Sequence, residues 1–389
     1  MKKIALVNQR YGLEVNGGSE YYTRQLAEHL KDDYDVTVLT TKAIGYDTWE
    51  NYYTEDEEVI GGVKVRRFDV KAKRNTLGMK LLFRLQKYLP FGKKKLQYLW
   101  IKAQGPYAPA LTCYMQEHEK EYDAFIFVTY LYYPTVFGIN AISDRAIMIP
   151  TAHDEPYIYF DIYRDIFQKA KALIYLTPEE KKFVESRFDV ADKKNVVTGA
   201  GVEIPKNISD TAFREKYKVA GEYIVYVGRV DPNKGCKEMF SVFESYKEQT
   251  EDSELKLVVL GKAEMEIPQR DDILYLGFVS EEDKFSCILG SQALWLPSQF
   301  ESLSIAVLEA MAMGIPVLVN GRCEVLKGHC DRSKAGVYYS NPEEAVSALQ
   351  YIRNEMDSDV IKINAHDYIN KNYTWEIIVK KLKMIIDQC

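Results

Sequence analysis

Two successive series of short apolar runs constrain the fold of this chain more than any other feature. The runs are rich in Val and Ile, and segments of helical periodicity separate them. This alternation indicates parallel sheets covered by helices, because buried parallel strands are almost continuously apolar. We expect strands at residues 4–7, 36–40, 63–68, 124–129, 146–150, 172–176, 196–198, 223–227, 255–260, 274–278, 293–296, 316–319 and 336–339. Helices are expected between them, for instance at 19–30, 178–187, 234–247 and 304–313.

A polar stretch, residues 203–221, interrupts the alternation and marks the expected domain boundary. A chain of 389 residues is long enough for two domains that each bury a core. We therefore expect an α/β protein with two Rossmann-like, doubly wound domains, residues 1–205 and 206–372, facing each other across a cleft. Such sheets bind ligands beyond the carboxyl ends of their strands, so the active site should lie between the two halves.

The composition excludes several classes of protein. Apolar residues make up 47 % of the chain and the net charge is only -6, which excludes disordered and collagen-like chains. No run of 18 apolar residues occurs, so we expect no membrane-spanning helix. Six scattered cysteines without a C-x-x-C pair suit a cytoplasmic protein. Cys323, His329 and Cys330 lie close in sequence, but the remaining ligands of a zinc site are missing, so no metal is expected.

The charge is distributed unevenly along the chain. Between Val70 and Gln116 there are ten basic residues and no acidic one, so this basic segment carries +10 and the remainder, given the total of -6, carries -16. Leu, Phe, Tyr and Trp side chains interleave with these charges. The combination is typical of an amphipathic surface that contacts anionic lipid. The expected membrane or acceptor surface consists of Lys80, Arg84, Lys87, Lys93, Lys94, Lys95 and Trp100.

Two other interpretations of the basic segment are open. It could bind nucleic acid, but the strongly acidic remainder would repel a long polyanion, so we expect no nucleic-acid partner. It could also form ordinary solvated helices whose apolar sides belong to the core.

In the first half, two polar clusters follow expected strands. The segment Asn16–Glu20 contains the adjacent Gly17 and Gly18, which would let main-chain N–H groups approach a ligand at a helix start; a plain tight turn explains them equally well. His153 follows another strand and has acidic neighbours, so it is suited to hydrogen bonding or proton transfer near neutral pH. A purely structural role is the alternative for this histidine.

In the second half, residues 227–235 read V-G-R-V-D-P-N-K-G, at the turn from a strand into a helix. Arg229 can fork onto phosphate oxygens, and Lys234 adds a compact charge near the helix start. Two fixed cations in one loop suit a diphosphate, although they could also be solvated in a surface turn. The run is not a Walker A loop.

The stretch 296–316 is the most informative, because a strand, a loop, a helix and the next strand follow in order. Glu301 lies in the loop and Glu309 within the helix, so both carboxylates can face one bound molecule. Acceptor-only groups suit a ligand with rows of hydroxyls, such as a sugar and a ribose. Phosphates between them would suit the main-chain N–H groups at the helix start, those of Ser302, Leu303 and Ser304.

Together these motifs resemble the family-4 retaining glycosyltransferases of the GT-B fold (glycosyl transferases group 1). The most specific part is the Glu-x7-Glu pair Glu301/Glu309 with its A-M-A-M-G-I-P-V continuation. The G-R-x4-K-G run 228–235, Gly17-Gly18 and His153-Asp154 add to it, and the resemblance covers both domains in the right order.

The resemblance implies a nucleotide-sugar donor that is bound mainly by the second domain. Arg229 and Lys234 would hold the donor diphosphate, Glu301 would hydrogen-bond the donor-sugar hydroxyls, and Glu309 would bind the ribose. Because two cations and a helix dipole stabilise the charge that develops on the departing diphosphate, no metal or other cofactor is expected.

The resemblance further implies that the acceptor is bound mainly by the first domain. His153 would lie beside the donor sugar near the reacting carbon, and Gly17-Gly18 would approach the diphosphate. A final helix in 373–389 would pack back on the first domain.

We therefore expect a retaining hexosyltransferase that uses a nucleotide-diphosphate sugar and a saccharide or lipid-linked acceptor, in bacterial surface polysaccharide biosynthesis. It would be cytoplasmic, with peripheral contact to the inner face of the cell membrane. A non-catalytic glycosyltransferase-like partner subunit and a GT-B nucleotide-sugar epimerase are the alternatives. The pattern predicts no particular sugar, base, acceptor identity or oligomeric state.

Overall fold

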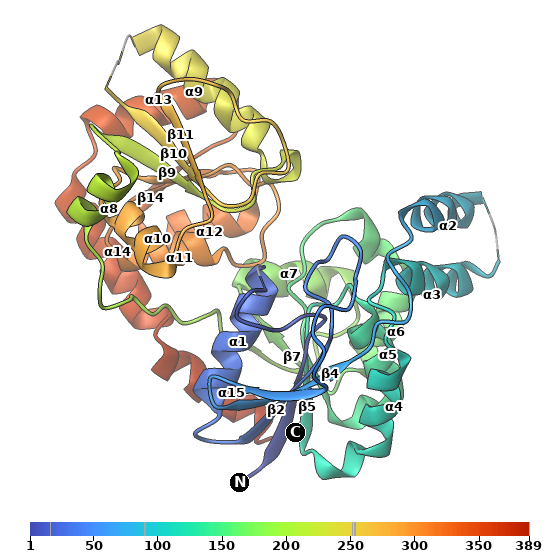
Figure 1. The fold of residues 1–389 in the computed structure, drawn as a ribbon. Coiled ribbons are helices and arrows are strands. Elements are labelled where there is room, and N and C mark those ends of the chain that lie inside the picture. The colour runs from blue at the N-terminus through green and yellow to red at the C-terminus, as the bar shows by residue number, and fades with distance from the viewer. Residues whose placement is uncertain (16, 89–90, 251, 253, 389) are drawn as a thin grey trace. The chain divides into compact units, whose positions relative to one another are not determined.

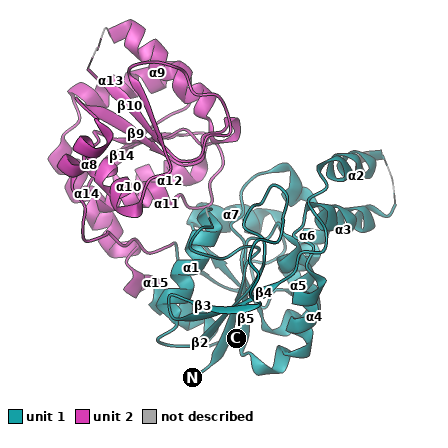
Figure 2. Cartoon of the chain, in the orientation of Figure 1, with its two compact units in different colours: residues 1–199, 379–389 teal, residues 200–378 magenta. Residues whose placement is uncertain are grey.

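The computed structural model describes residues 1–389 except 16, 89–90, 251, 253 and 389, and these residues form two compact units (Figures 1 and 2). Unit 1 consists of Met1–Gly199 and Val379–Cys389, and unit 2 of Ala200–Ile378. Each unit contains one helix-covered sheet, so the expected α/β class with two Rossmann-like domains is confirmed. The chain passes between the units at 199/200, where the sequence pattern predicts a boundary at 205/206. The cleft between the two halves stays a prediction.

The sheet of unit 1 has eight strands among the described residues, in the order β3-β4-β2-β1-β5-β6-β7-β8. All neighbours pair in parallel except β3 and β4. The central strands are apolar and buried along their length because helices cover both faces of the sheet. The bounds are β1 (Lys3–Val7), β2 (Asp35–Thr41), β3 (Glu57–Ile60), β4 (Val63–Phe68), β5 (Ala124–Val128), β6 (Ala146–Ile149), β7 (Ala172–Tyr175) and β8 (Lys194–Val197).

The edge strand β3 is absent from the sequence-based expectation. It is short, acidic and largely exposed, so it lacks the apolar run by which the other strands are recognised. Gly61 and Gly62, both at positive φ (58° and 82°), form the tight turn that folds β3 back against β4. Adjacent glycines between two strands indicate a hairpin, so the turn, and not the composition of the strand itself, is the sequence feature that predicts β3.

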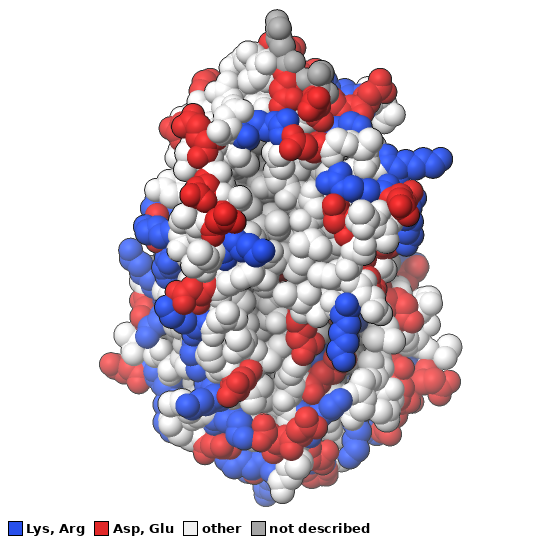
Figure 3. Space-filling model, turned by 90° about the vertical axis from the view of Figure 1, so that its left-hand side faces the viewer, with Lys and Arg blue, Asp and Glu red and all other residues white. Residues whose placement is uncertain are grey.

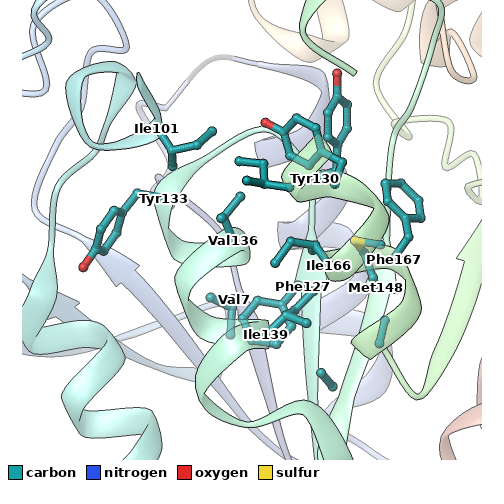
Figure 4. Close-up of a cluster of buried hydrophobic side chains, with 14 of the residues drawn as sticks. Val7, Ile101, Phe127, Tyr130, Tyr133, Val136, Ile139, Met148, Ile166 and Phe167 are labelled. Carbon is teal, nitrogen blue, oxygen red and sulfur yellow. The ribbon is translucent and has the colours of Figure 1, made fainter. Parts of the chain in front are cut away.

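A buried apolar cluster of unit 1 lies between the sheet and the helices α4, α5 and α6 (Figure 4). Val7, Phe127 and Met148 contribute from the strands, and Val136 and Ile166 from the helices. The helix α1 covers the opposite face (Figure 1). The helices of unit 1 are α1 (Gly18–Leu30), α2 (Thr76–Tyr88), α3 (Lys93–Gln104), α4 (Pro109–Glu117), α5 (Tyr133–Ala141), α6 (Asp161–Lys169) and α7 (Pro178–Arg187), with the 3-10 turns η1 (Glu119–Glu121), η2 (Ser143–Arg145) and η3 (Pro156–Tyr159).

The sheet of unit 2 has six strands among the described residues, in the order β11-β10-β9-β12-β13-β14, and all of its neighbours are parallel. This is the doubly wound order 3-2-1-4-5-6, in which the winding reverses between β9 and β12. The strands are β9 (Tyr223–Val227), β10 (Lys256–Leu260), β11 (Ile273–Gly277), β12 (Leu294–Leu296), β13 (Val317–Asn320) and β14 (Gly336–Tyr339). The helices are α8 (Asp210–Tyr217), η4 (Pro232–Lys234), α9 (Cys236–Thr250), α10 (Glu281–Leu289), α11 (Ile305–Ala312), α12 (Glu324–Ser333), α13 (Pro342–Asn354) and α14 (Ser358–Asn372).

The last helix, α15 (Trp375–Ile386), begins in unit 2 and ends in unit 1. Its residues after 378 belong to unit 1, where the Tyr34 hydroxyl donates to Asp387 Oδ1 (3.0 Å) and Lys2 Nζ donates to the Asp387 carbonyl (3.1 Å).

Within the basic segment, α2 and α3 form a hairpin that projects from unit 1 (Figure 1). Trp100 on α3 is only 1 % exposed and lies against Tyr157 and Phe160, with ring centroids 4.6 and 5.1 Å away. The prediction that Trp100 contributes to a membrane or acceptor surface is therefore wrong: its ring is the anchor that ties the hairpin to the core. Within the described residues, no helix combines the length and the hydropathy that crossing a bilayer requires.

Candidate active site

The loops that follow β9, β10 and β12 meet at the carboxyl edge of the unit 2 sheet. Gly235 has φ 77°, and a Cβ there would lie 2.4 Å from the Pro297 carbonyl oxygen; a Cβ on Gly261 would lie 2.0 Å from the Gly228 carbonyl oxygen. Both contacts are with main chain, which cannot move aside as a flexible side chain can. Only glycine permits these close approaches, which bring the loops together at the point where the winding reverses.

Asp231 organises the first of these loops. One carboxylate oxygen, Oδ1, accepts the N–H groups of Asn233 (2.7 Å) and Lys234 (3.1 Å), and Oδ2 accepts Arg229 Nε at 2.6 Å. Asp231 is only 4 % exposed, so these hydrogen bonds satisfy a nearly buried charge. The side chain therefore fixes both the Arg229 guanidinium and the main chain that carries Lys234.

The ammonium of Lys234 reaches the loop after β12. Its Nζ lies 2.7 Å from Glu301 Oε1, across 67 residues of sequence, and the two side chains are 30 % and 15 % exposed. The structure thus brings together Arg229, Lys234 and Glu301, which the sequence pattern predicts as one site. Their partial exposure leaves room for a ligand to contact them.

The charges around this cluster do not add up to a positive site. Arg229 Nε also lies 4.0 Å from Glu264 Oε2 on the loop after β10, and Lys262 Nζ lies 3.4 Å from Glu264 Oε1. Three cations therefore stand among three carboxylates, those of Asp231, Glu264 and Glu301, and the local sum of +3 and -3 is zero. Attraction of a diphosphate would depend on where the cations are held, not on an overall positive potential.

The helix α11 follows Glu301 and begins one residue after Ser304. Ser304 is its N-cap residue, has φ 67° and is 9 % exposed. A non-glycine residue at positive φ is strained and persists only where its surroundings fix it. Part of that restraint comes from the buried His329, whose Nε2 lies 2.8 Å from the Leu303 carbonyl oxygen. Ser302, Leu303 and Ser304 therefore lie at the helix start, as predicted.

Glu309 lies one to two turns into α11 and is 3 % exposed. Its Oε1 is 2.7 Å from Lys284 Nζ, and Lys284 also contacts Glu281 Oε2 at 2.9 Å. Burial raises the pKa of Glu309, and the Lys284 ammonium offsets only part of that effect. For Lys284, burial alone would lower the pKa, but the carboxylates of Glu309 and Glu281 outweigh it and raise the pKa. The predicted ribose-binding carboxylate is thus one half of a buried ion pair.

In unit 1, His153 follows β6 and is 31 % exposed. Its Nε2 lies 3.7 Å from Glu155 Oε1, and the same oxygen accepts the Tyr130 hydroxyl at 2.6 Å. Tyr130 follows the neighbouring strand β5, so Glu155 connects the ends of two strands. This environment gives the predicted histidine an acidic partner while leaving part of its ring open.

The main chain before His153 is held by the buried carboxylate of Glu180 on α7. Glu180 accepts the N–H groups of Ala152 and Leu176, each at 2.6 Å. Burial raises the pKa of Glu180 to about 8, although these main-chain donors favour its charged form. Thr129 and Thr151, at the ends of β5 and β6, have φ 75° and 52°, and their hydroxyl oxygens lie 3.0 Å apart. Such strain in β-branched residues indicates a loop that its neighbours fix tightly.

Gly17 is the N-cap residue of α1, and Gly18 is its first residue. Asn16, part of the predicted cluster, lies outside the described residues. Glu20, in the first turn, forms a buried ion pair with Arg10, whose Nη2 lies 2.6 Å from Glu20 Oε1. The glycine pair is therefore located at a helix start, beside a buried pair of opposite charges.

Two groups in these sites have no counterpart in the sequence-based prediction. Lys284 was missed because it lies 25 residues from Glu309 in sequence. Helical spacing predicts only its contact with Glu281, which is three residues away on the same helix. Glu180 was missed because it belongs to an ordinary helix start, in which Thr177 caps the helix by accepting the Glu180 N–H. The Thr-x-x-Glu spacing indicates such a cap, but not its contact with the loop of His153.

Among the described residues, no three His, Cys, Asp or Glu side chains form a group that could hold a metal ion. Cys323 and Cys330 are buried, and His329 is occupied by the Leu303 carbonyl and the Tyr368 hydroxyl.

Comparison with known proteins places this geometry in a family. Residues 208–375, which include the whole cluster around Lys234 and Glu301, match the model of the family "Glycosyl transferases group 1". Unit 2 carries a group 1 glycosyltransferase domain. An uncharacterized glycosyltransferase of Methanocaldococcus jannaschii is 26 % identical over 171 residues, which are 41 % of this chain and 43 % of that protein. The match thus spans less than half of the length of that glycosyltransferase.

Solved structures extend the likeness to the whole chain. A sucrose-phosphate synthase from Thermosynechococcus elongatus has a TM-score of 0.72 at 16 % identity, over 100 % of this chain and 99 % of that one. HepE of Anabaena, solved in complex with UDP-glucose, has a TM-score of 0.69 at 14 % identity over the full length of both chains. At these identities the likeness shows the fold alone, and the fold of this chain is GT-B.

Proposed function

We propose that this protein is a retaining, metal-independent hexosyltransferase that takes its sugar from a nucleotide-diphosphate donor. The observation that carries the proposal is the contact between Lys234 and Glu301 beside the Asp231–Arg229 pair, at the edge where the sheet of unit 2 reverses its winding. A diphosphate and a sugar are the two adjoining groups that paired cations and a carboxylate would bind. UDP-glucose in the complex of HepE, a chain of the same fold, supports this class of donor.

In this proposal Arg229 and Lys234 stabilise the negative charge that develops on the diphosphate as the bond from the anomeric carbon to its phosphate oxygen breaks. The N–H groups at the start of α11 add to the same effect. Glu301 orients the donor sugar and Glu309 the ribose. The acceptor oxygen attacks from the face that the diphosphate leaves, and its proton passes to a phosphate oxygen of the leaving group, so configuration is retained without a protein nucleophile or a metal ion.

Within unit 1, the proposal assigns His153 to the donor sugar near the reacting carbon, and Gly17 and Gly18 to the diphosphate. The acceptor is a saccharide or a lipid-linked saccharide, and the pathway is bacterial surface polysaccharide biosynthesis. The protein would then work in the cytoplasm, at the inner face of the cell membrane.

The test is a thermal-shift panel with UDP-, GDP-, ADP- and dTDP-sugars, each in the presence of EDTA. A donor at a hundred times its dissociation constant adds about 2.7 kcal/mol to stability. The nucleotide sugars that carry the correct nucleobase should therefore raise the melting temperature clearly, and the others should not. Lys234→Ala should abolish that shift while Lys237→Ala, an exposed lysine three residues further along the same segment, preserves it.

A shift of equal size in both variants would remove the diphosphate assignment. Release of the nucleoside diphosphate in the presence of acceptor separates a transferase from a non-catalytic subunit. Interconversion of the donor sugar without any acceptor would instead support an epimerase.

A further inference from the structure

The helix α2 has two apolar faces, and only one of them belongs to the core. On the inner face, the ring of Phe83 lies 5.6 Å from that of Tyr157, and Gln86 accepts a hydrogen bond from Gln97 Nε2 at 3.1 Å. Met79 and Leu82 share this face, since residues three, four and seven apart lie on one side of a helix. Through these contacts α2 packs on α3 and on the core of unit 1.

The opposite face carries a second apolar row, which is exposed. Its members recur at intervals of four, four and three residues and therefore form one stripe. They are Leu77 (79 % exposed), Leu81 (59 %), Leu85 (39 %) and Tyr88 (83 %). Phe91, in the turn between the two helices, is 86 % exposed. A helix of a globular protein usually has a single apolar stripe, so this outer row requires its own explanation.

Basic side chains lie beside the outer row. Lys80 and Arg84 are exposed on α2, and Lys93 and Lys95 are exposed in the first turn of α3. None of these four forms a salt bridge within the described part of the chain, whereas their neighbour Lys94 pairs with Asp165 at 2.7 Å. The side chain of Lys87 lies outside the described residues.

The face of the molecule shown in Figure 3 has a different charge pattern. On this face, Lys and Arg side chains are interspersed with Asp and Glu. The basic segment holds ten positive charges without a single acidic residue. A stripe of leucines and aromatic rings next to like charges that have no counter-charge is the arrangement of a helix lying in a lipid interface.

We propose that α2 docks on a membrane containing anionic lipids, with its outer apolar row inserted among the acyl chains and Lys80, Arg84, Lys93 and Lys95 at the headgroups. Charge complementarity selects this partner, because an uncharged apolar surface would leave four cations without counter-charges. Tyr88 and Phe91 mark the end of the inserted row, where aromatic rings suit the boundary between headgroups and acyl chains. The inference goes beyond the proposed function because it names the inserting residues and does not depend on the donor site.

Sedimentation of the full chain with vesicles tests the docking. Vesicles of phosphatidylcholine with 30 % phosphatidylglycerol should bind the protein at roughly 0.1 M salt and much less at roughly 1 M salt, where the screening length falls to about 3 Å. Pure phosphatidylcholine vesicles should bind it weakly. Lys80→Gln/Arg84→Gln should lower the partition coefficient roughly 30-fold, because each basic residue contributes about a fivefold factor. The control Lys182→Gln/Lys380→Gln, at exposed lysines elsewhere, should leave it unchanged.

Insertion is tested separately from charge. Leu77→Ser/Leu81→Ser removes apolar groups that are already in water, so the fold should be preserved, but vesicle binding should fall about tenfold or more. Val360→Ser/Ile363→Ser makes the same change at exposed positions of α14 (51 % and 68 %) and should have no effect. Tryptophan placed at position 88 (Tyr88→Trp) should be quenched by lipids brominated on their acyl chains.

Three results would overturn the proposal. Binding that is lost in the charge variant but unchanged in the Leu77/Leu81 variant, without quenching, would mean adsorption on headgroups alone. Binding that is indifferent to phosphatidylglycerol would remove the anionic membrane as the partner. A dimer in light scattering that dissociates in Leu77→Ser/Leu81→Ser would show that a second copy covers the row. None of these measurements uses the nucleotide-sugar donor or enzymatic turnover. A negative result for membrane docking would therefore leave the proposed glycosyl transfer untouched.

Discussion

The loops at the carboxyl ends of the strands are held by different means in the two units. In unit 2, charged side chains from different loops meet directly, as Lys234 and Glu301 do at the surface. In unit 1, the buried carboxyl group of Glu180 holds the main chain of the neighbouring loop by accepting hydrogen bonds from its N–H groups. In unit 2, therefore, the groups that join the loops are also the groups that a ligand could contact. In unit 1, the supporting group is out of reach, and His153 is left with part of its ring open.

The largest effect is expected from the buried ion pair of unit 2. Lys284→Met leaves the carboxylate of Glu309 buried without its cation, which should cost about 3–5 kcal/mol of unfolding free energy. Lys234→Met removes a cation from a partly exposed pair and should cost no more than about 1 kcal/mol. Differential scanning calorimetry of the full chain measures both changes. If the two variants lost equal stability, the distinction between the buried pair and the partly exposed pair would fail.

A double-mutant cycle sharpens this result. Lys284→Met/Glu309→Gln removes both charges, so it should recover much of the stability that Lys284→Met loses. Additive losses in the two single variants would contradict the direct contact at 2.7 Å.

The next effect concerns Glu180 and pH. Its pKa is raised from 4.5 to about 8 by burial, so between these values the folded protein holds a proton that the unfolded chain has released. The stabilisation is fully present below about pH 4.5 and is lost as pH rises toward 8, by about 3 kcal/mol between pH 5 and pH 8. Glu180→Gln should abolish this slope, as measured by urea unfolding at several pH values. Glu185→Gln, on the same helix, serves as the control and should retain the slope.

The smallest effect has the opposite sign and belongs to unit 2. Burial, with a contribution from the nearby Arg332 charge, lowers the pKa of His329 to about 3. Its stabilisation is present above pH 6.5 and is lost as pH falls toward 3, by about 2 kcal/mol between pH 7 and pH 4.5. His329→Gln keeps a donor and an acceptor for Leu303 and Tyr368, so acid unfolding should begin at a lower pH than in the wild type or in His366→Gln. An unchanged midpoint of acid unfolding in His329→Gln would contradict the expectation that protonation of His329 destabilises the folded protein.

Much of the fold could be predicted from the sequence because its strands are buried on both faces. β4, α7, β9 and β14 have the bounds that the pattern predicts, and α1 begins one residue earlier than expected. The antiparallel edge strand β3 was not predicted, because a strand at an exposed edge does not need apolar residues. Apolar periodicity thus predicts the elements that build the core, and it misses those that merely extend a sheet.

The candidate site was predicted in part, for a reason of the same kind. Arg229, Lys234 and Glu301 were identified because loops after neighbouring parallel strands must converge at one edge of the sheet. Trp100 was misassigned because the sequence of a basic stretch does not distinguish a tryptophan whose ring faces lipid from one whose ring is buried in the core. Lys284 and Glu180 act through contacts between separate elements, and no local spacing predicts such contacts. How each of these residues acts in the reaction stays a prediction.

The position of Asp231 has a consequence for the spacing of the two cations in the proposed donor site. One carboxylate orients the guanidinium of Arg229 and also the peptide that carries Lys234, so the span between the two cations depends on a residue that need never meet the anion between them. Either cation could be exchanged without moving the other, but a wider or narrower gap would require a different anchor. If Arg229 and Lys234 hold the donor diphosphate as proposed, the size of the anionic group that fits between them is set by Asp231, behind the two side chains that would contact it.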